Sequence, residues 1–187
     1  KEFTILQKGN TIQQNGETFN FTYKEYLTEI RKKIEEVIQD NPNRKIILDA
    51  PTGSGKTTLA NDMLKEHQGF LFLPARMTVQ QKAKQYGAAG LYEKAKGGEK
   101  YSPYNPVHIA TYEQTKSIPA EAYRNRWCII DEAHKLGTEA SEHFRKDSID
   151  RLMQAADASA RTVLMTGTAN RLRLIYPDAV FIICRPE

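Results

Sequence analysis

The sequence predicts an α/β domain built on a mostly parallel sheet, preceded by a β-hairpin and a helix. Six short apolar runs recur from residue 45 onward, at 45–49, 69–73, 107–110, 127–131, 162–165 and 180–184. They are apolar at nearly every position, which is typical of strands that helices cover on both faces. Helix-length segments separate the runs, so consecutive strands are expected to run parallel.

The first 43 residues follow a different pattern. Residues 11–21 alternate around Asn15-Gly16, a dipeptide that favours a type I′ turn, so we expect a hairpin that reverses there. Apolar residues then recur at helical spacing over 23–38, and Asn-Pro-Asn at 41–43 ends that helix. The expected division is an N-terminal hairpin and helix over 1–43, packed on a core domain of 44–187.

Composition is that of an ordinary globular protein. The 187 residues are 40% hydrophobic, and none of the apolar runs approaches the roughly 18 residues of a membrane span. No secretory leader is recognisable, so we expect a cytoplasmic or otherwise intracellular protein without a membrane partner. Cys128 and Cys184 lie inside apolar runs, which favours buried, reduced thiols. The net charge of +4 permits nucleic-acid binding without demonstrating it.

A phosphate-binding loop follows the first apolar run. Ala50 to Thr57 reads APTGSGKT, which has P-loop spacing if Ala is allowed at its first position. The glycines let successive N–H groups converge on one phosphate, and the helix expected over 56–67 points its positive end there. Lys56 can reach the β- and γ-phosphates, and the Thr57 hydroxyl can complete a Mg²⁺ shell. The expected nucleotide-binding residues are Thr52, Gly53, Ser54, Gly55, Lys56, Thr57 and Thr58.

The fourth apolar run leads into Asp131-Glu132-Ala133-His134. Alone, an acid pair after a strand is more often a solvated strand end. Downstream of a P-loop on a parallel sheet, Asp131 suits a metal-holding carboxylate and Glu132 a base that orients the attacking water. His134 can hydrogen-bond toward a neighbouring strand and report the phosphate state.

Several motifs together resemble those of superfamily-two helicases. APTGSGKT, DEAH and Met165-Thr166-Gly167-Thr168 look like motifs I, II and III, in that order. Residues 71–87 resemble motif Ia with its Pro-x-Arg core at 74–76, and residues 110–114 lie where motif Ib would fall. The likeness covers roughly residues 44–184. It differs in three ways: TGT replaces Ser-Ala-Thr, Ala75 replaces a frequent Thr, and no convincing Q-motif precedes the P-loop.

This resemblance implies a DEAH-box motor with two RecA-like domains, ATP and Mg²⁺ between them, and DNA or RNA, single-stranded in the cleft, across both. It implies that Lys56, Glu132 and His134 are catalytic, and that Thr57 and Asp131 serve the metal. Coupling of nucleotide state to strand movement would involve Thr166, Gly167 and Thr168. Nucleic-acid contacts would involve Pro74, Arg76 and Thr111.

The second RecA-like domain and its arginine fingers are expected after residue 184, and the sequence given ends at Glu187. We therefore expect the first RecA-like domain alone, with weak nucleotide binding and slow hydrolysis. Two alternatives stay open: a P-loop small-molecule kinase, and a regulatory or nucleic-acid-binding module without motor activity.

Other features carry weaker expectations. Residues 87–106 are too broken for a long helix, although a short one can lie inside them, and a strand-contacting role for the Lys94–Lys100 region is the minority interpretation. Tyr112 is expected to pack in the core. His67, His108 and His143 lack metal-like spacing and are expected to be ordinary histidines.

Overall fold

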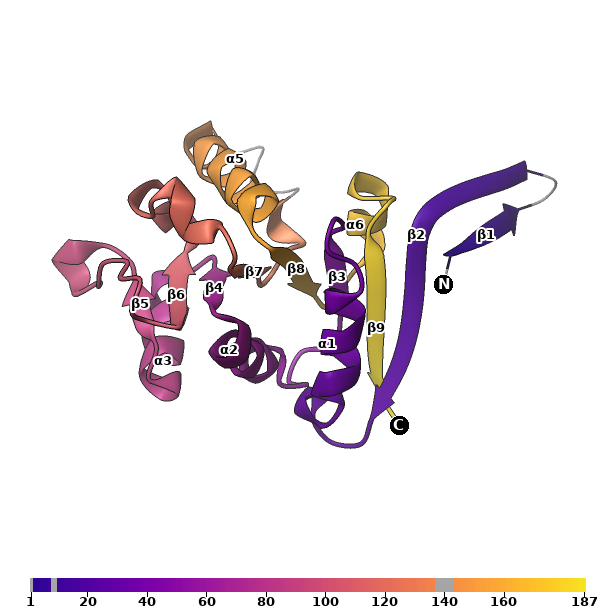
Figure 1. Cartoon of the computed structure of the whole chain (residues 1–187), viewed down its shortest axis with the longest axis horizontal. Helices are drawn as coiled ribbons and strands as arrows, with labels where there is room; N and C mark the ends of the chain where they lie inside the picture. Colours follow the sequence, from indigo (N-terminus) through magenta and orange to yellow (C-terminus); the bar gives the residue numbers. More distant parts are fainter. Residues whose placement is uncertain (1, 8–9, 137–142) are drawn as a thin grey trace.

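The computed structural model describes residues 2–7, 10–136 and 143–187 and shows one sheet covered by helices on both faces (Figure 1). The described strands are β1 (Glu2–Gln7), β2 (Asn10–Tyr23), β3 (Ile46–Asp49), β4 (Gly69–Leu73), β5 (Ala89–Leu91), β6 (Val107–Thr111), β7 (Trp127–Ile130), β8 (Arg161–Thr166) and β9 (Val180–Pro186). Their order is β1-β2-β9-β3-β8-β7-β4-β6-β5. Every neighbouring pair is parallel except β1 and β2.

The helices form two layers, one on each face of the sheet. The α-helices are α1 (Arg31–Gln39), α2 (Lys56–His67), α3 (Arg76–Tyr86), α5 (His143–Ala158) and α6 (Asn170–Ile175). The 3-10 helices are η1 (Leu27–Ile30), η2 (Lys94–Lys96), η3 (Tyr112–Ser117) and η4 (Ala120–Tyr123). One apolar core lies between the sheet and α1, α2 and α3, and a second lies between the sheet and η3, η4, α5 and α6.

Alternation along the strands fills both cores. In β3, Ile46 and Leu48 belong to the first core and Ile47 to the second, and all three are fully buried. Successive side chains of a strand point to opposite faces, so a strand buried on both faces must be apolar throughout. The six apolar runs are therefore strands, as predicted. The helix expected over 56–67 is also confirmed as α2, and both cysteines are buried, free thiols.

The position predicted for the hairpin turn is wrong. β2 runs without interruption through Asn15-Gly16, and the hairpin joins β1 to β2 through residues 8–9, which lie outside the described part of the chain. The register with β1 shifts between Gln13 and Glu17, so Asn15-Gly16 marks a β-bulge, a usual place for glycine inside a strand. Beyond the bulge, Thr18 to Tyr23 leave β1 and pair in parallel with β9.

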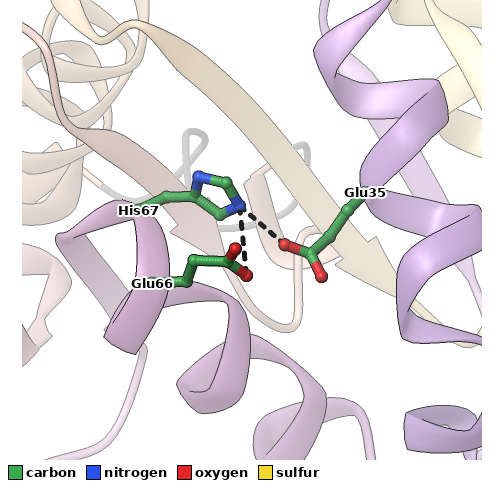
Figure 2. Close-up of side chains that lie close together, drawn as sticks. All are labelled: Glu35, Glu66 and His67. Atoms are coloured by element: carbon green, nitrogen blue, oxygen red, sulfur yellow. Dashed lines mark hydrogen bonds and ion pairs between the residues drawn. The ribbon is translucent and has the colours of Figure 1, made fainter.

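A salt-bridge network fixes α1 on α2 (Figure 2). His67 Nε2 lies 2.6 Å from a Glu35 oxygen and 3.8 Å from a Glu66 oxygen. These three side chains have metal-ligand atoms within 4.8 Å of one another. The Arg31 guanidinium, however, pairs with both carboxylates, at 2.9 Å from Glu35 and 3.2 Å from Glu66. The His67 ring also stacks on Trp127 with centroids 4.0 Å apart, so the network ties both helices to β7.

Among the described residues, the helices are all too short or too polar to cross a bilayer.

Candidate nucleotide site at the carboxyl edge of the sheet

The loop between β3 and α2 has the backbone of a phosphate cradle. Gly53 and Gly55 adopt φ angles of 81° and 91°, in the left-handed region that favours glycine. α2 begins at Lys56, and no side chain of the described residues caps its first turn. The first N–H groups of a helix have no partner within it and carry the positive end of its dipole. The loop therefore presents unpaired donors to an anion.

A cavity of about 570 Å³ opens in front of these donors. It brings the P-loop and the acid pair together, although they lie some 75 residues apart in the sequence. The residues that line it are Tyr26, Thr28, Thr52, Gly53, Gly55, Lys56, Thr57, Thr58, Lys82, Asp131 and Glu132. Ser54 is predicted for the same site, but it is buried and does not line the cavity.

Lys56 is held at the base of the loop. Its ammonium donates to the Ala50 carbonyl at 2.9 Å. A Cβ on Gly167 would lie 3.9 Å from the same nitrogen and 3.6 Å from the Ala50 oxygen, so the loop after β8 packs directly against the P-loop. Ala50 N–H also donates to Thr166 O at 3.0 Å, so Ala50 connects the Lys56 ammonium to the backbone of Thr166.

Asp131 stands at the end of β7 and is buried. Its N–H donates to Phe72 O at 2.9 Å, and its carbonyl accepts the Tyr112 hydroxyl at 2.6 Å. Burial raises the pKa of the Asp131 carboxyl, while the Glu132 N–H and the Lys56 ammonium partly oppose that rise. Tyr112 is fully buried in the second core, which confirms its predicted core position. From there its hydroxyl holds the backbone of the acid pair.

Glu132 has an unusual backbone for a residue with a side chain, with φ at 56°. Left-handed backbone costs about 1–2 kcal/mol in a residue other than glycine. Three hydrogen bonds hold the turn: Glu132 N–H to Asp131 Oδ1 at 2.9 Å, Ala133 N–H to Met165 O at 2.9 Å, and Lys135 N–H to Glu132 O at 2.9 Å. Strain of this kind gathers at functional sites, where the surrounding structure enforces it.

His134 links the acid corner to the loop after β8. Its Nε2 lies 3.5 Å from a Glu132 oxygen and its Nδ1 lies 3.4 Å from the Thr166 hydroxyl. That hydroxyl in turn accepts the Thr168 N–H at 3.0 Å. Glu132, His134, Thr166 and Thr168 therefore form one connected chain of polar groups.

The three residues predicted to contact nucleic acid also come together. Pro74 and Arg76 follow β4, Thr111 ends β6, and all three border a cavity of about 410 Å³ at the carboxyl edge of these strands. Arg76 is the first residue of α3, and its guanidinium donates to Gln80 Oε1 at 3.2 Å. This cavity has no lining residue in common with the cavity at the P-loop, so the carboxyl edge of the sheet carries two separate cavities.

Residues 20–171 match a protein family described as the Type III restriction enzyme, res subunit (ResIII). The chain belongs to the ResIII family. Comparison with curated protein sequences finds no significant match.

Solved structures share the fold of this ResIII domain at low identity. The helicase domain of Pyrococcus furiosus Hef is 16% identical, with a TM-score of 0.53 over 86% of this chain and 39% of that one. Dbp5 of S. cerevisiae, bound to RNA and ADP BeF3, is 17% identical, with a TM-score of 0.57 over 82% of this chain and 45% of the Dbp5 chain. The ATP-dependent Type ISP restriction-modification enzyme LlaBIII, bound to DNA, is 13% identical, with a TM-score of 0.55 over 87% of this chain and 13% of the LlaBIII chain.

The ResIII domain thus spans less than half the length of each of these chains. The likeness confirms the predicted RecA-like α/β fold with its parallel central sheet.

The ResIII site also contains residues that the motifs did not indicate. Tyr26 and Thr28 reach the nucleotide cavity because Leu27 N–H donates to Ser54 O at 3.0 Å, which fixes η1 against the P-loop. The Glu29 carboxylate accepts the N–H groups of residues 24, 25 and 26 and so anchors the start of η1. The sequence signals neither feature, because Tyr26 stands where a recognisable capping box has Ser or Thr and the contact with Ser54 is tertiary.

The donors and carboxylates of the ResIII site fit a magnesium-bound nucleoside triphosphate. The unpaired N–H groups at the start of α2 and the Lys56 ammonium suit phosphate oxygens. The Thr57 hydroxyl and the Asp131 carboxylate border the same cavity and offer the hard oxygen ligands that Mg²⁺ prefers. In this structure the Thr57 hydroxyl also lies 3.3 Å from the Tyr86 hydroxyl, a contact that a metal would compete with.

Proposed function

We propose that this chain is the first RecA-like motor domain of a DEAH-box type helicase or translocase, which binds Mg-ATP and hydrolyses it to ADP and phosphate while acting on nucleic acid. The observation that carries the proposal is the single cavity in which the P-loop, Lys56, Asp131 and Glu132 meet. Membership of the ResIII family and the fold shared with Hef and Dbp5 support it.

Each site residue then has a defined task. The N–H groups at residues 53–58 hold the phosphates, and the Lys56 ammonium leaves the Ala50 carbonyl to contact the β- and γ-phosphate oxygens. Thr57 and Asp131 hold the magnesium ion. When bound, Mg²⁺ neutralises charge that develops on the transferred phosphoryl group. Glu132, half exposed at the mouth of the cavity, orients the attacking water and accepts its proton.

His134, Thr166, Gly167 and Thr168 relay the state of the γ-phosphate. The polar chain from Glu132 through His134 to Thr166 supports this assignment, because movement of any member changes the hydrogen bonds of the next. Gly167 lies against Lys56 and Ala50, so contact of Lys56 with phosphate would displace the same loop.

The second cavity, bordered by Pro74, Arg76 and Thr111, is proposed to hold single-stranded DNA or RNA. Its position at the same sheet edge, beside the nucleotide site, lets one ligand influence the other. Dbp5 is bound to RNA and LlaBIII to DNA, and they share this fold.

The domain organisation stays part of the proposal. Residues 1–43 would form an N-terminal unit on a RecA-like core of 44–187, and a second RecA-like domain would complete the ATP site. An absent arginine finger lowers turnover by about 10³ to 10⁵. We therefore expect the isolated chain to bind Mg-ATP weakly and hydrolyse it slowly.

Glu132→Gln tests the enzymatic part directly. The variant is expected to retain Mg-ATP binding and to lose hydrolysis, measured as single-turnover release of phosphate from radiolabelled ATP. Equal, measurable hydrolysis by parent and variant would contradict the role of Glu132. If neither protein releases phosphate, whether or not the proposed second RecA-like domain is present, the result would instead favour a regulatory nucleotide-binding module.

A further inference from the structure

The segment after β5 forms a compact loop, with η2 at its start. Glu99 N–H donates to Gly90 O at 2.8 Å, and Gly90 N–H donates to Glu99 Oε2 at 2.8 Å, so the end of the loop returns to β5. Gly97 has a φ of 95°, and a Cβ on Gly98 would clash with the Tyr92 carbonyl. The two glycines therefore permit a closed turn that a chain with side chains at these positions could not make.

Closure of this loop brings two lysines together. Lys94 and Lys100 are both exposed and line the same cavity, and the neighbouring Lys100 ammonium lowers the pKa of Lys94. Within the described ranges, neither ammonium has a carboxylate oxygen within 4.0 Å. Two like charges held together without a counter-charge are an arrangement that an anion stabilises.

The lysine pair borders a cavity of about 640 Å³ that adjoins the cavity of Arg76 and Thr111. The two cavities have four lining residues in common: Tyr92, Glu93, Gln114 and Lys116. An extended ligand can therefore pass from Arg76, across the exposed Lys116, to Lys94 and Lys100. This path contains four cations.

We propose that Lys94 and Lys100 bind consecutive phosphates of a single-stranded nucleic acid, and so extend the binding track beyond the predicted contacts at Pro74, Arg76 and Thr111. The proposal rests on the proposed function, because it assumes that nucleic acid occupies the adjoining cavity. It adds a phosphate site built by the closed turn at Gly97 and Gly98, outside all the helicase-like motifs of the sequence.

The acidic groups nearby define the limits of the site. Glu93 borders both cavities, and Glu99 is engaged by Gly90 N–H. A phosphate beside Glu93 meets repulsion, so Glu93→Gln is expected to tighten binding while Lys94→Gln and Lys100→Gln weaken it.

The test measures binding of fluorescein-labelled oligothymidylate and oligouridylate by anisotropy between 0.02 and about 0.2 M salt, a range chosen because phosphate contacts weaken steeply across it. Each phosphate contact to a single strand contributes about 0.7 to the slope of log K against log salt, so Lys94→Gln/Lys100→Gln should reduce the slope by about 1.4. If the two curves converge at 1 M, that difference is roughly 25-fold in affinity at 0.1 M. Lys32→Gln/Lys65→Gln, which removes two exposed lysines of α1 and α2, should leave the slope unchanged.

The outcomes separate this inference from the proposed function. An Arg76→Gln variant that loses binding while Lys94→Gln/Lys100→Gln keeps the parent slope would overturn the phosphate site and leave the nucleic-acid role intact. A parent chain that binds neither oligonucleotide would overturn both. Equal losses for oligonucleotides and for polyglutamate of matched charge would show a surface for anions in general, which also contradicts the inference. Lys94→Arg/Lys100→Arg should retain the slope.

Discussion

Glu132 offers a test of whether the acid corner is a strained, enforced structure. We compare Glu132→Ala with Glu132→Gly, because both remove the carboxylate and they differ only in the Cβ methyl group that makes left-handed backbone costly. At φ 56° alanine keeps the left-handed cost of about 1–2 kcal/mol, and glycine avoids it. Glycine loses about 0.4–1 kcal/mol more than alanine through the entropy of the unfolded chain. The midpoints of these two ranges predict that the glycine variant is more stable by about 0.8 kcal/mol.

Urea unfolding of the two variants, followed by tryptophan fluorescence, measures this difference in the free energy of unfolding when the two curves have equal m-values. The same pair of substitutions at Lys65, an exposed residue of α2, is the matched control. There alanine should be more stable by about 0.8–1 kcal/mol, the usual order inside a helix. An alanine variant at position 132 that is as stable as the glycine variant, or more stable, would show that this position behaves as ordinary backbone and that the turn is not strained.

Three further predictions concern buried charges. Burial raises the pKa of the Asp131 carboxyl, so its ionised form destabilises the fold. Asp131→Asn should therefore raise the melting temperature of the nucleotide-free chain at pH 7, and this gain should vanish as the pH falls below that pKa. The same variant should lose Mg²⁺-dependent nucleotide binding. Burial and the Arg126 charge lower the pKa of His108 to about 4. The free energy of unfolding of the parent should therefore fall as the pH falls from about 6.5 toward 4, because the unfolded chain binds a proton that the folded chain does not. In urea titrations, His108→Phe should lose less of its free energy of unfolding over the same pH range. Glu35→Ala should cost about 1.5–3 kcal/mol, because it removes the shorter of the two carboxylate contacts of both Arg31 and His67 and leaves them only Glu66. His67→Ala should add much less in that background. Glu36→Ala, on the exposed side of α1, should change stability by less than about 0.5 kcal/mol.

The core strands could be predicted because a strand that is buried on both faces is apolar at every position, and such a run is visible in the sequence. Ile46 to Leu48 and Gly69 to Leu73 are apolar without interruption, and the structure buries every one of them. The order of the strands left no such record. β2 pairs with β9, some 160 residues later, and that contact depends on where the chain turns rather than on any local pattern.

Asn15-Gly16 shows how the same residues can suit two structures. A dipeptide that supplies positive φ fits a hairpin turn and a bulge equally well, and the choice depends on pairing with β1 and β9. Tyr26 was missed for a related reason. Its place at the nucleotide cavity follows from one backbone hydrogen bond between Leu27 and Ser54, which spacing does not reveal.

The candidate site was more predictable than the topology. Chemistry restricts which residues can hold phosphate and magnesium, so the sequence predicted one site for Lys56, Thr57, Asp131 and Glu132, and the structure places all four around one cavity. The left-handed backbone of Glu132 and the loop that pairs Lys94 with Lys100 arise from tertiary contacts, and sequence motifs carry no signal for them.

Calorimetric titration of ATP into the parent chain and into Lys56→Ala, each with and without Mg²⁺, tests whether the cavity at the P-loop binds nucleotide. We expect Mg²⁺-dependent binding to the parent and its loss in Lys56→Ala, because Lys56 at the base of the P-loop lines the same cavity as Asp131 and Glu132. Lys82→Ala, which removes another lysine at that cavity, should weaken binding far less. Equal binding of ATP by the parent and Lys56→Ala would contradict the assignment of this cavity as the nucleotide site.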